Sequence, residues 1–229
     1  MQTLLSRYAG WSALAYGILI LAGLVALILF FSLEFARATS DGAQGKPGFY
    51  FFGFLSDVLP AVANAALLVL AFAWDGEAPA AARLWSRLGV ACCILAALLN
   101  VVAFAGITSR ALSVPQQAVV VMVANLPFGI WLLIASRLAG SAGTLPSPLA
   151  TFGAVCGAAL IAGALAFLLL GGLGWYSAPS FNSMFERLPL AITAIVVYLF
   201  QFACPIWALL VWRALASQSA GSIAPVASL

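Results

Sequence analysis

The stretch WSALAYGILILAGLVALILFFSL, residues 11–33, decides the fold class, because it runs for 23 residues without a charged side chain. The hydrocarbon core of a bilayer is about 30 Å thick, and about 20 apolar residues in a helix cross it. A helix suits this setting because it satisfies its own backbone hydrogen bonds where water is absent. The stretch therefore predicts a transmembrane helix.

The same apolar character extends over the whole chain of 229 residues, of which 65% are hydrophobic and only 7% are charged. Soluble domains carry about 25% charged residues. The formal net charge is only +3, and no run of like charge occurs, so the chain offers no surface for nucleic acid. The composition predicts an integral membrane protein whose principal partner is the lipid bilayer.

Six stretches long enough to cross a bilayer follow one another, separated by charged residues, Gly and Pro. They cover approximately residues 11–33, 49–74, 88–107, 118–136, 149–170 and 188–212. Their apolar character is too even for barrel strands, in which it alternates. We expect an all-α polytopic transmembrane helix bundle of about six spans over residues 1–216, followed by a flexible C-terminal tail at 217–229.

An even number of spans places both termini on one side of the membrane, and the positive-inside rule indicates which side. Five basic residues lie on the side of the termini and four on the other: Arg7, Arg83, Arg87, Arg137 and Arg213 against Arg37, Lys46, Arg110 and Arg187. This small excess, together with the free amino terminus, favours cytoplasmic termini in a bacterial inner membrane.

Asp57 is an acidic residue inside the second span, among Leu, Val and Phe. A carboxylate near the centre of a spanning helix raises the insertion free energy by about 2.5–3.5 kcal/mol, so we expect it to find a polar partner. At about 1.5 Å per residue, Asp57, Asn100 and Asn125 reach a similar depth from three different spans. Asn64, two turns beyond Asp57, and Gln201 in the sixth span extend this predicted polar layer.

Two interpretations of this layer stay open. In the first, it forms a pocket that binds a small molecule, a lipid headgroup or a proton, with transport as an extension, because an ionisable group inside a membrane indicates a functional site. Six spans are few for an independent transporter, which would favour a homo-oligomer. In the second, the amides bridge helices for about 0.6–2 kcal/mol per hydrogen bond in a structural or accessory subunit of a larger membrane complex.

Small residues predict close helix packing in two spans. Gly153 and Gly157 lie four residues apart in the fifth span, and Gly163 follows them. Such spacing lets the backbone of a neighbouring helix approach closely. Ala13 and Gly17 repeat the spacing in the first span. The spacing does not say whether the neighbour belongs to the same chain or to a second protein. Within the chain, we expect the first and fifth spans to pack against each other.

Several chemistries are set aside by the residue types. The chain has no histidine, its single lysine, Lys46, lies in a loop, and its four cysteines lack metal-ligand spacing. Histidine-ligated haem, the commonest zinc sites, His-based catalytic triads and a retinal Schiff base are therefore not expected. Ser56 adjoins Asp57, but adjacent helical residues point about 100° apart and do not form a catalytic pair. We expect no cofactor and no metal, and a role other than catalysis.

Two segments carry a resemblance to a known group. The fourth span closes on an arginine in GIWLLIASRLAG, residues 129–140, and a Leu-Pro loop in TLPSPLATFGAV, residues 144–155, opens the Gly-rich fifth span. With the order of the six spans, which covers most of the chain, these segments resemble an uncharacterised bacterial family of small six-helix multi-pass membrane proteins. The resemblance implies a membrane helix bundle. That family has no assigned activity, so no functional residue carries over.

Overall fold

The computed structural model describes residues 2–34, 50–109, 111–177 and 188–221, and it contains no strand among them. Six long helices follow one another within these residues: α1 (Gln2–Leu29), α3 (Phe51–Glu77), α4 (Arg83–Thr108), α5 (Val114–Ser141), α6 (Ser147–Leu169) and α7 (Leu188–Gly221). Three short elements accompany them, the π-helix η1 (Phe30–Glu34) and the 3₁₀ helices η3 (Ala80–Ala82) and η4 (Gly172–Ser177). Each long helix contains a window long and apolar enough to cross a membrane. The predicted all-α fold of six spans is confirmed.

The helix boundaries agree with the predicted spans to within five residues, except that α1 begins nine residues earlier, at Gln2, and α7 ends nine residues later, at Gly221. The extension of α7 includes residues 217–221 of the predicted tail. The rest of that tail, residues 222–229, lies outside the described residues.

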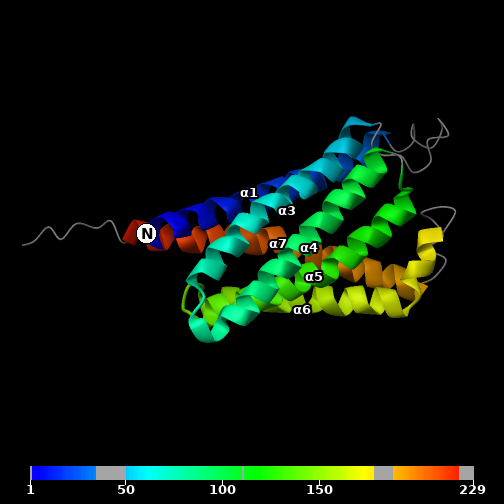
Figure 1. Cartoon of the computed structure of the whole chain (residues 1–229). Coiled ribbons are helices and arrows are strands. Elements are labelled where there is room, and N and C mark those ends of the chain that lie inside the picture. Colours follow the sequence, from blue (N-terminus) through cyan, green and yellow to red (C-terminus); the bar gives the residue numbers. More distant parts are fainter. Residues whose placement is uncertain (1, 35–49, 110, 178–187, 222–229) are drawn as a thin grey trace, which may run out of the picture.

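The six helices form a closed ring in chain order. Each helix packs against the one before it and the one after it, and α7 returns to pack against α1. Figure 1 shows the helices side by side, with the N-terminus, the C-terminal part of α7 and the α3–α4 turn toward one end. We call this the terminal end of the ring, and we call the opposite end, which carries the α4–α5 turn, the loop end.

Large aromatic side chains fill the ring interior in its terminal half. Trp207 of α7 meets Trp74 of α3 and Trp131 of α5 edge-on, with ring centroids 6.2 Å apart in both pairs. Phe128 stacks on Trp131 at 5.8 Å and lies 6.4 Å from Tyr16 of α1. Apart from the stack of Phe128 on Trp131, which lies within α5, these contacts join helices that are not neighbours in the ring, so they cross its interior. We call the five side chains the aromatic plug.

The glycines of α6 permit close packing against its two neighbours. A Cβ added at Gly157 would lie 2.7 Å from the backbone O of Gly129 and 2.7 Å from the backbone N of Leu133, both on α5. Since real Cβ contacts are essentially never shorter than 3.0 Å, only glycine fits at this crossing. Gly153 similarly faces side chains of α5 and α7, and Gly163 faces α7.

The prediction that the first span packs against the fifth is wrong. Ala13 is fully buried, and a Cβ at Gly17 would lie 2.8 Å from the Leu209 side chain and 3.1 Å from the Pro205 carbonyl, both on α7. Because α7 closes the ring, it lies between α1 and α6, and α1 packs against α3 and α7 instead.

Candidate functional site

Asp57 of α3 meets Gln117 of α5 in the interior near the loop end. Gln117 Nε2 donates a hydrogen bond to Asp57 Oδ1 at 2.8 Å. The other carboxylate oxygen, Oδ2, is buried and has no hydrogen-bond partner among the described residues. Because α4 lies between α3 and α5 in the ring, this contact reaches across the interior. Both oxygens therefore lie within the bundle, and we call these two residues the acid–amide pair.

Local structure positions the two helices that carry this pair. Glu34, at the end of η1, accepts hydrogen bonds from Phe52 N at 3.1 Å and Gly53 N at 3.3 Å, which caps the first turn of α3. At the start of α5, Gln116 Oε1 accepts a hydrogen bond from Ser113 N at 2.8 Å. This is half of a capping box, an arrangement that fixes where a helix begins. The pair thus lies in the first turns of two capped helices.

Asn125 and Gln201 form a second hydrogen bond across the ring. Gln201 Nε2 of α7 donates to Asn125 Oδ1 of α5 at 2.6 Å. The Asn125 amide nitrogen donates in turn to the backbone O of Val121 at 3.1 Å, and Asn125 is only 3% exposed. Along α5, Asn125 lies about two turns, roughly 12 Å, beyond Gln117. We call Asn125 and Gln201 the amide pair.

Tyr198 of α7 precedes Gln201 by three residues, so both side chains lie on the same side of α7, with Tyr198 about one turn nearer the loop end. Polar side chains from α3, α5 and α7 therefore succeed one another from the loop end inward. We call Asp57, Gln117, Tyr198, Gln201 and Asn125 the polar track.

Asn64 and Asn100 bond to their own helices. Asn64 Nδ2 donates to the backbone O of Pro60, and Asn100 Nδ2 donates to the backbone O of Ala96, both at 2.8 Å. Among the described residues, neither side chain has a recorded hydrogen bond to Asp57 or to the amide pair. The five residues of the predicted layer therefore do not form one cluster. Asn125 pairs with Gln201, Asp57 pairs with Gln117, and Asn64 and Asn100 each bond to their own helix.

Sequence reasoning missed Gln117 and Tyr198. The apolar window of the fourth span begins at Ala118, so Gln117 was left just outside it. A signal was present, since Ser113 is followed three residues later by Gln116, a spacing that predicts a helix start ahead of the apolar run. Tyr198 was counted with the apolar residues, although a buried phenol usually finds a polar partner.

The described residues contain no group of three or more His, Cys, Asp or Glu placed to hold a metal ion. All four cysteines are free thiols. Cys156 of α6 and Cys204 of α7 are completely buried. Cys204 donates to the backbone O of Phe200 at 3.2 Å. The thiols therefore contribute to helix packing.

Comparisons with known proteins found no match: no family model, no curated protein and no solved structure matches the chain. The resemblance to an uncharacterised bacterial family stays a prediction. Function therefore has to be argued from the site.

Proposed function

We propose that this multi-pass membrane protein binds and releases a proton at Asp57 and carries a small polar solute along the polar track. The observation that supports the proposal is the incomplete set of partners around the Asp57 carboxylate. Oδ1 accepts one hydrogen bond from a neutral amide, and Oδ2 accepts none among the described residues. An ionised acid in a membrane interior is costly without compensation, and an amide cannot neutralise it. A proton bound at Oδ2 removes the negative charge that the amide leaves uncompensated.

The arrangement of the ring interior supports transport over a purely structural role. Carboxyl, hydroxyl and amide groups can each bond to a polar solute, and along their helices they follow one another from the loop end to the amide pair. Beyond this point the aromatic plug fills the interior toward the terminal end. One half of the ring axis is therefore polar and the other is closed by aromatic side chains. Passage of a solute requires the aromatic plug to move.

Carbodiimide labelling tests the proposal. Dicyclohexylcarbodiimide enters the bilayer and adds to protonated carboxyl groups, so we expect a mass adduct on the peptide that contains Asp57. The adduct should decrease as the pH rises and be absent from Asp57→Asn. The matched control is Glu77→Gln, which removes an acid at the other end of α3 and should leave labelling of Asp57 unchanged. An Asp57 that stays unlabelled at every pH, or that labels equally at all pH values, would contradict proton exchange.

The second candidate function is a structural one, as a subunit of a homo-oligomer or of a larger membrane complex. It is favoured by the outer face of α6, where Thr151, Val155, Ala158 and Ala162 are all exposed at spacings of four, three and four residues. Small residues at such spacing suit close contact with a helix of another subunit. An Asp57 that is inert to carbodiimide would favour this candidate.

We also propose a bacterial inner membrane as the location, with both termini in the cytoplasm. The support is the excess of five basic residues over four on the terminal side. A green fluorescent protein fused to the C-terminus folds in the cytoplasm but not after export to the periplasm, so we expect fluorescent cells. Dark cells that contain the full-length fusion would reverse the orientation.

A further inference from the structure

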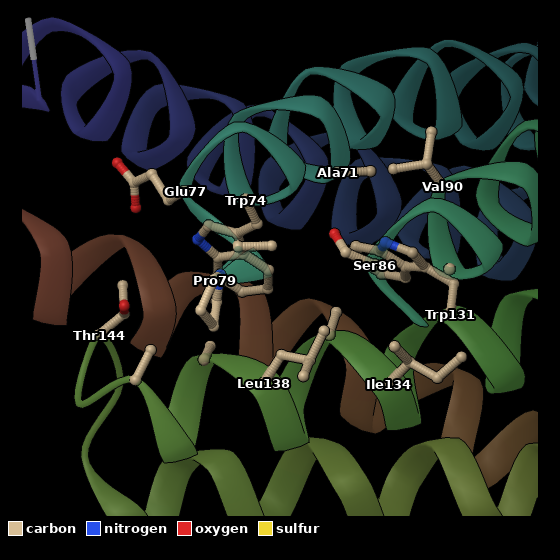
Figure 2. A pocket seen from close by; sticks show the side chains of 15 residues that line it. Ala71, Trp74, Glu77, Pro79, Ser86, Val90, Trp131, Ile134, Leu138 and Thr144 are labelled. Carbon is tan, nitrogen blue, oxygen red and sulfur yellow. The ribbon is translucent and has the colours of Figure 1, made fainter. Parts of the chain in front are cut away.

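A separate polar site lies at the terminal end, on the far side of the aromatic plug from Asp57. A pocket with a cavity volume of ≈ 40 Å³ opens between α3, α4, α5 and the α3–α4 turn. One water needs about 10–15 Å³ by the same measure, so the pocket has room for about three waters or one small functional group. Figure 2 shows its lining side chains.

Two indole rings and one carboxylate characterise this pocket. Trp74 and Trp131 belong to its lining and also contact Trp207 of the aromatic plug. Glu77 is the only charged residue that lines it, while Ser86 and Thr144 contribute hydroxyl groups. In Figure 2 the Glu77 carboxylate lies on the side of Thr144, and Ser86 lies beside Trp131. The pocket therefore combines aromatic surface with a net negative charge.

The Glu77 carboxylate has room to accept a cationic ligand. Its side chain is exposed, and it forms no ion pair among the described residues. The nearby arginines of α4 and α5, Arg83, Arg87 and Arg137, do not belong to the lining. An unneutralised carboxylate beside indole rings attracts cations, through charge-assisted hydrogen bonds and through cation–π contacts.

The position of the pocket along the membrane normal suits a lipid headgroup. It lies where the spans of α3 and α4 end and the short η3 turn connects them. Tryptophan side chains are enriched at this level of a bilayer, where the headgroups begin. Amines carried by phospholipids are therefore at the same depth as Glu77.

We propose that this pocket binds a primary ammonium group, either the ethanolamine headgroup of a phospholipid or a soluble alkylamine. A primary ammonium presents three N–H donors, which match the carboxylate of Glu77 and the hydroxyl group of Thr144 on the same side of the pocket. A quaternary ammonium has no N–H donor and cannot form these hydrogen bonds. This site shares no residue with the polar track, so it does not depend on the proposed function of Asp57.

Binding measurements on the full-length protein in detergent test the proposal. Isothermal titration calorimetry with n-butylamine and with tetramethylammonium compares primary and quaternary cations, and native mass spectrometry compares retained phosphatidylethanolamine and phosphatidylcholine of the same acyl chains. We expect n-butylamine to bind more tightly than tetramethylammonium, or phosphatidylethanolamine to be retained over phosphatidylcholine, or both. Glu77→Gln should weaken that binding about tenfold, since it removes one charge-assisted hydrogen bond.

Matched variants separate binding from folding. Trp74→Phe keeps an aromatic ring and should weaken binding about threefold through the poorer cation–π contact. Asp75→Asn and Trp85→Phe change an acid and an indole that do not line the pocket, and both should bind as the wild type does. Asp57→Asn should also bind the amine as the wild type does. A failure of the proposal for proton exchange at Asp57 would therefore not affect the proposal for the Glu77 pocket.

The outcomes divide clearly. Glu77-dependent retention of phosphatidylethanolamine would identify a lipid as the source of the ammonium, and Glu77-dependent binding of butylamine alone would identify a soluble amine; both support the site. Primary and quaternary amines that bind equally would overturn the proposal. So would amine and lipid binding that is the same in the wild type and in Glu77→Gln.

Discussion

Replacing Gly157 by alanine is expected to lower the free energy of unfolding by about 1–3 kcal/mol, as overpacking of a tightly packed interior does. The added Cβ would meet two backbone atoms of α5, Gly129 O and Leu133 N, each at 2.7 Å. Backbone atoms cannot rotate away as side chains do, so α5 and α6 would have to separate along their contact. Alanine has the higher helix propensity by about 1 kcal/mol, which offsets only part of this loss.

Equilibrium unfolding in increasing mole fractions of dodecyl sulfate, followed by tryptophan fluorescence, measures the change. The control is Gly76→Ala at the exposed end of α3, where an added Cβ meets nothing within 4 Å. Gly76→Ala should leave stability unchanged or raise it by up to about 1 kcal/mol, since only helix propensity changes. Equal stability of the two variants would show that α5 and α6 do not pack backbone to backbone.

At a pH where Asp57 is ionised, replacing Gln117 by leucine is expected to destabilise the protein by about 1.5–3 kcal/mol, the range for a lost hydrogen bond to a charged group. The substitution leaves both oxygens of Asp57 without a partner among the described residues. Asp57→Leu should cost less, because the neutral amide left behind is cheaper to bury than a carboxylate. The double variant Asp57→Leu with Gln117→Leu should recover most of the lost stability, since no polar group is stranded.

The four proteins of this double-mutant cycle are compared in the same unfolding assay. A coupling energy of about 1 kcal/mol or more between the two positions is expected. Asn64→Leu is the matched control, since the side chain of Asn64 bonds to the backbone of its own helix and to no other of the described residues. It should show no coupling to Gln117→Leu. Additive losses at Asp57 and Gln117 would mean that the acid–amide pair contributes nothing.

The fold was predictable because it depends on properties that each segment carries by itself. Residues 11–33 form a helix in a bilayer whatever packs beside them, since the apolar side chains favour hydrocarbon and the backbone bonds to itself. The order of the helices around the ring depends instead on how side chains fit together. Gly17 indicates a close approach in the first span, but nothing in the sequence says that its neighbour is α7.

The polar residues of the site were predictable, but their relative depth and direction were not. Counting residues from a helix end depends on where the helix begins: α5 starts at Val114 and not at the predicted Ala118, and Asn125 lies about 12 Å beyond Gln117, the partner of Asp57, and not level with Asp57. Such counting also says nothing about which way each helix is turned, so Asn100 was expected beside Asp57 but bonds to Ala96 of its own helix. Gln117 was missed because a hydropathy window ends at the first polar residue, where a capped helix can continue.

The central claim is that the Asp57 carboxyl group lies inside the ring, holds a hydrogen bond from Gln117 and exchanges its proton. Infrared difference spectroscopy of the protein in lipid, recorded as the pH is changed, tests it directly. The account predicts a carboxyl C=O band that changes with pH, disappears in Asp57→Asn and moves in frequency in Gln117→Leu, because the amide donor polarises the carbonyl. Spectra of the wild type and Asp57→Asn that superimpose over the whole pH range would contradict the claim.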